Sequence, residues 1–222
     1  MNPKIFIGLL GFLGLGIFAQ AATDWTKLSA DEFARRPEVQ QRIDPAHFDE
    51  ALLSTAVFHE TNRVRRRLGL PLFKHLAKLD DAADLKAAVG VFEPGLSHES
   101  YLPAIATPAA RIASMGLEYQ RIAENIARLP SYDLPAGIKQ VGVRKVGGRE
   151  EYYRFDTGGP LELRTYESFA VYAVDSWMNS PGHRANIVNP ALAALGCAAR
   201  PCEEPVSGHA QIYAVQVFFT PL

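Results

Sequence analysis

The first 21 residues have the three-part pattern of a secretory signal peptide. Lys4 supplies a positive charge, the uncharged run 5–18 is almost wholly apolar, and Ala19 and Ala21 are small residues at the positions that a signal peptidase reads. The run is too short to span a bilayer, which needs about 20 apolar residues. We therefore expect cleavage after Ala21, so that 201 of the 222 residues fold outside the cytoplasm. An uncleaved membrane anchor is the alternative.

The length and charge of the remaining chain favour one globular domain with no general affinity for polyanions. About 200 residues are enough for one substantial hydrophobic core. The sequence has 23 Lys and Arg against 24 Asp and Glu, a net charge of −1. Because no net positive charge attracts phosphate groups, nucleic acid is not an expected partner. No transmembrane segment is expected once the signal has been removed.

The only two cysteines, Cys197 and Cys202, are separated by four residues. In an exported protein so close a pair favours a disulfide. Closing that small loop would add about 2 kcal/mol of stability. The spacing is not Cys-x-x-Cys, which makes a redox or zinc motif the weaker interpretation. We predict a structural disulfide between them.

The order of the predicted elements, helices first and strands between and after them, favours an α+β fold. Ser29 and Glu32 form a capping box, and Asp44 is the expected N-cap of the first long helix. The remaining pattern predicts helices over about 45–68, 74–89, 103–115 and from 165 onward, an exposed hairpin around Gly147-Gly148, and strands at 195–199 and 210–219.

Three polar residues lie in apolar or tightly turned segments. They are His98, Glu124 and His183. A carboxylate between Ile122 and Ile126 is expected to be partly buried and to need a partner, a proton or a metal. Two imidazoles and one carboxylate would suit a zinc ion that keeps an open position for water. Each of the three could instead be a satisfied core or turn residue.

Segments from about residue 50 to 220 resemble, in the right order, the CAP superfamily. This superfamily comprises the cysteine-rich secretory, antigen 5 and pathogenesis-related 1 proteins, which share the SCP domain, and the resemblance is closest to its bacterial secreted branch. The most specific segments are Ala123-Glu124-Asn125-Ile126-Ala127 and the stretch from Trp177 through Asn186, Trp-Met-Asn-Ser-Pro-Gly-His-Arg-Ala-Asn.

The resemblance implies a three-layer α-β-α sandwich with a small central antiparallel sheet. Together with the signal-peptide pattern of residues 1–21, it divides the rest of the chain into an N-terminal extension (22–46) and an SCP domain (47–222) in which 131–164 is a hairpin insertion. It also implies a cavity lined by two histidines and two acidic residues, which binds a divalent metal in some members. The motif residues expected around that cavity are Asn125, Trp177, Ser180 and Asn186.

His98, Glu124 and His183 match three of those four cavity residues, and Ser180 stands at the fourth position. Helical spacing from Trp177 predicts that Ser180 points toward the interface between layers. A site with two histidines and only one carboxylate would hold a metal more weakly or would complete its coordination in a different way. The resemblance therefore leaves metal occupancy open, with zinc as the ion that this donor set favours.

Three functions are compatible with this sequence. The first is a secreted or periplasmic binding protein whose cavity holds a metal, a lipid-like ligand or a peptide, acting on an unknown partner at the envelope or outside the cell. The second is a metal-dependent hydrolase in which Glu124 is the general base or third ligand. The third is a structural envelope protein that acts through the hairpin or the extension. No nucleophile and base stand out as a unit, which favours binding over catalysis.

Overall fold

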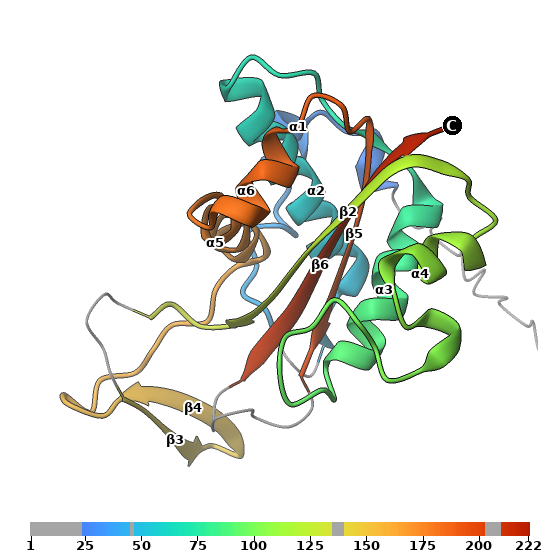
Figure 1. Ribbon diagram of the computed structural model, residues 1–222. Coiled ribbons are helices and arrows are strands. Elements are labelled where there is room, and N and C mark those ends of the chain that lie inside the picture. The colour runs from blue at the N-terminus through green and yellow to red at the C-terminus, as the bar shows by residue number, and fades with distance from the viewer. Residues whose placement is uncertain (1–23, 45–46, 135–139, 203–209) are drawn as a thin grey trace, which may run out of the picture.

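A mixed four-stranded sheet lies between two layers of helices (Figure 1). The computed structural model describes residues 24–44, 47–134, 140–202 and 210–222. The predicted signal peptide and its cleavage site lie outside these ranges. The strand order is β1-β5-β6-β2, and its members are β1 (Lys74–His75), β2 (Tyr119–Pro130), β5 (Ala194–Pro201) and β6 (Gln211–Pro221). The predicted α-β-α sandwich is confirmed, with the addition that the short β1 pairs with β5 in parallel.

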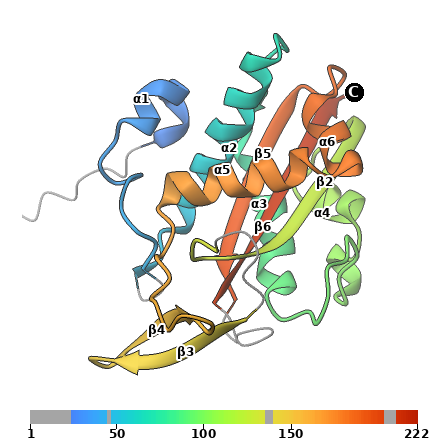
Figure 2. The same ribbon diagram turned by 90° about the vertical axis from the view of Figure 1, so that its left-hand side faces the viewer.

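The two helical layers cover opposite faces of this sheet (Figure 2). One layer contains α1 (Ala30–Ala34), α2 (Glu50–Arg67), α5 (Tyr166–Met178) and α6 (Pro181–Val188), whereas the other contains α3 (Ala77–Gly90) and α4 (Pro108–Ser114). Two short 3-10 helices, η1 (Trp25–Lys27) and η3 (Pro103–Ile105), precede α1 and α4.

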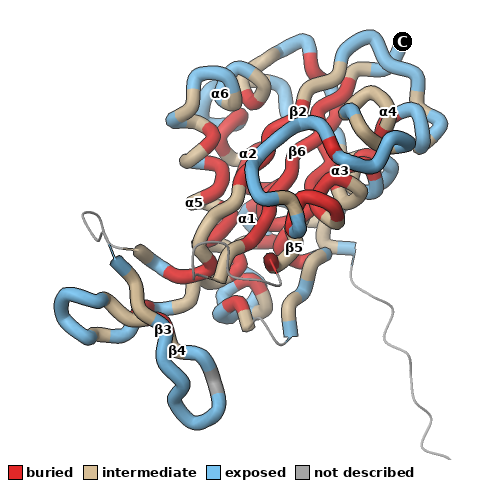
Figure 3. Tube along the Cα trace, turned by 60° about the horizontal axis from the view of Figure 1, so that its bottom comes forward, coloured by how far each residue is buried: buried red, intermediate tan, exposed pale blue. Residues whose placement is uncertain are grey.

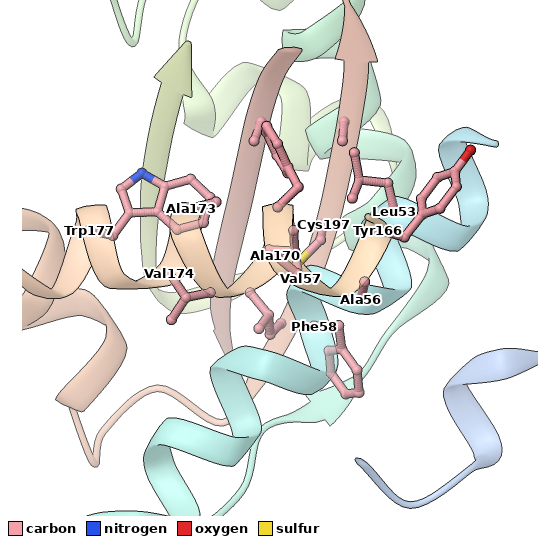
Figure 4. Close-up of a cluster of buried hydrophobic side chains, with 14 of the residues drawn as sticks. Leu53, Ala56, Val57, Phe58, Tyr166, Ala170, Ala173, Val174, Trp177 and Cys197 are labelled. Atoms are coloured by element: carbon pink, nitrogen blue, oxygen red, sulfur yellow. The ribbon is translucent and has the colours of Figure 1, made fainter. Parts of the chain in front are cut away.

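Strand β6 is the centre of the hydrophobic core because it is buried on both faces. Successive side chains of a strand point to opposite faces. Ile212, Ala214 and Phe218 accordingly join a cluster under α2 and α5, part of which is drawn in Figure 4. Tyr213 and Val215 join a second cluster under α3 and α4. The continuous apolar run of 210–219 therefore predicted this strand correctly.

The N-terminal extension is part of the same core. The predicted capping box is present, since the Glu32 amide donates to Ser29 Oγ over 3.2 Å and the Ser29 amide donates to the Glu32 carboxylate over 2.9 Å. Phe33, Val39 and Ile43 all belong to the cluster under α2 and α5. The extension thus contributes apolar side chains to the core that the strands and long helices form.

The first long helix begins later than the sequence predicts. Helix α2 starts at Glu50, and its N-cap is Asp49, whose Oδ1 accepts from the Leu52 amide over 2.9 Å. Asp44 instead lies 3.0 Å from His47 Nδ1. Two aspartates five residues apart offer the same capping chemistry, so the prediction chose the wrong one.

The predicted disulfide is wrong, because Cys197 and Cys202 are both free. Cys197 lies in β5, and Cys202 follows directly and still donates its amide to the Gln211 carbonyl of β6. Five residues of extended chain span about 16 Å, whereas a disulfide needs Cα atoms within about 7 Å. The odd spacing also puts the two thiols in different clusters, on opposite faces of the sheet.

The predicted hairpin is a separate two-stranded ribbon, formed by β3 (Val141–Val146) and β4 (Arg149–Arg154). Gly147 and Gly148 have φ of 58° and 83°, a conformation that favours glycine. The ribbon extends away from the sandwich and is largely exposed (Figure 3). Tyr152 anchors it by stacking on Tyr132 with ring centroids 5.0 Å apart.

Among the described helices, none is both long and apolar enough to cross a membrane.

Candidate functional site

Glu124 lies on β2 with a side chain that is only 1% exposed. Its Oε1 is 2.9 Å from His98 Nδ1, and its Oε2 accepts a hydrogen bond from Arg111 Nη2 over 2.7 Å. Both carboxylate oxygens therefore have a close partner. A buried carboxylate is stable as an anion only with such compensation.

Arg111, on α4, is the buried cation of this site and was missed from the sequence. Besides Glu124, it donates to the carbonyl oxygens of His98 over 3.1 Å and of Ile105 over 2.9 Å. It therefore fixes both the carboxylate and the loop that carries His98. One signal was available in the sequence, since Arg111 is the only charged residue of the otherwise small and apolar helix Pro108–Ser114.

A second buried cation holds the other side of the same loop. The side chain of Lys86, on α3, is fully buried, and its Nζ donates to Glu93 Oε2 over 2.6 Å. The same Nζ donates to the Glu99 carbonyl over 3.1 Å and lies 3.3 Å from Ser100 Oγ. Because Glu99 and Ser100 directly follow His98, Lys86 and Arg111 together position this histidine.

His183 reaches the site from the opposite layer, in the first turn of α6. Its carbonyl accepts from Asn125 Nδ2 over 3.2 Å, and Asn125 Oδ1 accepts from Asn186 Nδ2 over 2.8 Å. Burial lowers the pKa of His183, and the charge of His98 lowers it further.

Adjacent residues of β2 point to opposite faces, which explains how one strand serves both layers. Glu124 faces the partners from α4, whereas Asn125 faces α6 and α2. Asn125 Nδ2 also donates to Gln216 Oε1 over 2.9 Å, and Gln216 Nε2 donates to Thr61 Oγ1 over 2.6 Å. This buried chain of polar groups fixes the backbone at His183. Gln216 is a fully buried polar residue in the middle of the apolar strand β6, and its sequence position alone did not indicate this contact.

Comparison with known proteins identifies the family of this chain. A model of the cysteine-rich secretory protein family, CAP, matches residues 58–218. The chain belongs to the CAP family. No curated protein matches the sequence.

Three solved structures of bacterial proteins are similar to this chain. An outer surface protein from Borrelia burgdorferi is 16% identical with a TM-score of 0.51, over 82% of this chain and 99% of that protein. An extracellular SCP-domain protein from Bacillus anthracis is 21% identical with a TM-score of 0.49, and a cysteine-rich secretory protein from Staphylococcus aureus is 13% identical with a TM-score of 0.44. Each of these two matches covers 77% of this chain, which spans only 41% and 39% of the respective proteins.

Two further CAP motif residues were assigned to the cavity from the sequence. Trp177 is 1% exposed and donates its Nε1–H to the Ile126 carbonyl over 3.2 Å, so it is a core residue that joins α5 to β2. Ser180 lies outside α5, which ends at Met178, and occupies the N-cap position of α6. Ser180 is half-buried there, and its orientation toward the interface between layers stays a prediction.

The donor set of this CAP site does not fit a divalent metal in the observed geometry. Across the described ranges, no group of three or more His, Cys, Asp or Glu side chains is placed to hold a metal ion. The Arg111 guanidinium lies 2.7 Å from Glu124 Oε2, which puts a fixed positive charge where a metal cation would need the carboxylate.

Proposed function

We propose that this CAP domain is an exported binding protein that holds the polar head of a lipid-like ligand beside His98 and His183. The observation that carries the proposal is that both carboxylate oxygens of Glu124 already have a partner, one in His98 and the other in Arg111. A carboxylate that is already paired in this way is poorly available as a metal ligand or as a general base. Binding by the two imidazoles therefore accounts for the site better than metal-dependent hydrolysis.

The free edge of His98 is suited to contact a ligand. Its side chain is 49% exposed, and its Nε2 has no hydrogen-bond partner in the part of the chain that the structure describes. Because Nδ1 faces the Glu124 carboxylate and is expected to carry a proton, Nε2 is directed away from the carboxylate. When both ring nitrogens carry a proton, Nε2 can donate a hydrogen bond to a carboxylate or phosphate group.

The loop that carries His98 also presents apolar surface. Leu96, Tyr101 and Leu102 are 54%, 66% and 42% exposed, although they lie within six residues of His98. Large apolar side chains gathered on one rigid loop are typical of a surface that binds another molecule. A polar group next to exposed apolar side chains matches an amphipathic ligand.

Nuclear magnetic resonance of the histidine rings can test this proposal. Hexanoate and hexyl phosphate are suitable probes, with hexyltrimethylammonium as the charge-reversed control. We expect one of the two anionic probes to shift the His98 ring signals saturably, and His98→Ala to abolish binding. His47, whose side chain is 83% exposed, is an internal reference that should not respond. Zinc-dependent cleavage of casein that requires Glu124 would instead support the hydrolase.

Export from the cytoplasm is the second part of the proposal. Its support is the signal-peptide pattern of residues 1–21, together with the extracellular, secretory or surface description of the three solved relatives. N-terminal sequencing of the protein recovered from outside the cytoplasm should begin at Ala22. A sequence that begins at Met1 would contradict cleavage.

A further inference from the structure

A cavity of about 420 Å³ opens at the edge of the sheet that lies opposite the Glu124 site. Strand β1 pairs with β5 only at Ala194 and Leu195, so beyond this point α2 and α3 flank the edge of β5. The cavity lies there, between the two helices and the N-terminal turn η1. Its volume is within the range of pockets that bind small molecules.

The walls of this cavity are strongly acidic. Five carboxylates from three separate elements line it, namely Asp24, Glu50, Asp80, Asp81 and Asp84.

Three cations compensate these carboxylates only in part. Arg200 forms two hydrogen bonds of 2.6 and 2.8 Å with Asp84 and lies 3.5 Å from Glu50. His75 Nε2 is 2.5 Å from Asp80 Oδ2, and Lys27 lies 3.0 Å from Asp24. Asp81, which is exposed, has no ion-pair partner among the described residues. A negative charge therefore remains in the cavity even when every nearby cation is counted.

An unpaired hydroxyl in the wall is independent evidence for a ligand. Thr55 is only 8% exposed and lines the cavity, yet its hydroxyl has no hydrogen-bond partner within the described ranges. The hydroxyl of its neighbour Ser54, in contrast, donates to the Glu50 carbonyl over 2.6 Å. The Thr55 hydroxyl is not sealed off from solvent, so it opens onto the cavity, where a ligand can supply the missing partner.

The spacing of the carboxylates favours an elongated organic cation over a metal ion. No three of them converge on one point among the residues that the structure describes. Phe58 and Ala51 add apolar surface beside the carboxylates. An ammonium group has three donors for carboxylate and hydroxyl oxygens, and an aliphatic stem can lie along apolar side chains.

We propose that this cavity binds an aliphatic ammonium group, carried by a free polyamine or by a lysine side chain of a peptide. Asp81 and Thr55 would accept hydrogen bonds from the ammonium group, and Phe58 would contact its stem.

Calorimetric titration of the chain from Ala22 to Leu222 with spermidine, and separately with a blocked trilysine peptide, tests this proposal. We expect saturable binding that Asp81→Asn weakens about fivefold, the effect of one lost charge pair at a partly exposed site. Thr55→Val, which keeps the side-chain shape but removes the hydroxyl, should weaken binding as well. Stronger binding of spermidine would identify a free amine as the source, and stronger binding of the peptide would identify a lysine side chain.

Two control variants make the test specific. Glu118→Gln removes an exposed carboxylate just before β2, at the opposite edge of the sheet, and should leave binding unchanged. His98→Ala should also leave it unchanged, so the result does not depend on the proposed function of the other site. Absence of binding by both probes would overturn the proposal. An equal loss of binding affinity in Asp81→Asn and Glu118→Gln would also overturn the proposal, because that result indicates non-specific attraction of the probe to an acidic surface.

Discussion

An arginine guanidinium that is almost completely buried is stable only where hydrogen-bond acceptors surround it. Arg111 is 1% exposed, and the Glu124 carboxylate and the carbonyls of His98 and Ile105 supply these acceptors. Glu124 depends on Arg111 in return, since its own side chain is equally buried. The geometry of the candidate site therefore depends on a pair of buried charges that must be present together.

Removal of one member of this pair should destabilise the protein strongly. We expect Arg111→Met to lower the free energy of unfolding by about 3 kcal/mol, because the Glu124 charge would remain buried without its cation. Arg121→Met, at an exposed arginine of β2, should change it by less than about 0.5 kcal/mol. Urea unfolding measures both. The double variant Arg111→Met/Glu124→Gln should recover part of the loss, and equal effects of the two single variants would contradict the argument.

The two cysteines provide a second prediction at the residue scale. Burial raises the pKa of both thiols, and Cys197 is only 1% exposed, so neither should react with iodoacetamide in the folded protein. After denaturation in urea without reductant, mass spectrometry should find both thiols alkylated. Protein that stays unmodified until a reductant is added would show that a disulfide forms after all.

Helix α3 packs closely against strand β5 at Gly196. A Cβ atom at this position would lie 2.3 Å from the Leu79 carbonyl carbon and 2.4 Å from the Asp80 amide nitrogen. These are backbone atoms of α3, so a side-chain rearrangement cannot relieve the contact. The absence of a side chain at Gly196 therefore sets how closely α3 approaches the sheet.

Gly196→Ala should consequently be among the more damaging single-methyl additions in this chain. We expect a loss of about 3 kcal/mol in the free energy of unfolding, since α3 or β5 must shift to admit the methyl group. Gly95→Ala is the matched control, because nothing lies within 4 Å of its Cβ position. Thermal unfolding followed by circular dichroism compares the two, and a similar melting temperature would refute this account of the packing.

Some elements of this fold can be predicted from the sequence better than others. The difference depends on whether the side chains of an element need polar partners from distant parts of the chain. Strand β6 is predictable because its side chains are almost all apolar. Strand β2 was not predicted, since Glu124 and Asn125 interrupt its apolar pattern. Their partners Arg111, Gln216 and Asn186 come from elements that only the folded chain brings together. Local patterns therefore identified the residues of the site but not the contacts among them.

At the scale of the whole molecule, the two helical layers meet beside β1 through His75. This histidine packs edge-on against Phe58 of α2, with ring centroids 5.3 Å apart, and its Nε2 is 2.5 Å from Asp80 of α3. Asp80 also accepts the Cys197 amide of β5 over 2.8 Å. One short strand thus connects both layers and the sheet at an edge that has no further strand among the described residues.

This connection should make the stability of the whole fold depend on pH. The hydrogen bond to Asp80 and its charge raise the pKa of His75 above its ordinary value of 6.5, although burial opposes the effect. The folded state therefore binds the His75 proton more tightly than the unfolded state does. The stabilisation that the His75–Asp80 pair contributes is fully present below the pKa of His75 in the unfolded state. This stabilisation is lost as the pH rises through the pKa of His75 in the folded state.

His75→Gln should therefore cost more stability at about pH 5.5 than at about pH 8.5, as measured by urea unfolding. In an Asp80→Asn background the difference between the two pH values should shrink, because His75 has then lost the partner that raises its pKa. A cost of His75→Gln that is the same at both pH values would show that His75 joins the layers by packing alone.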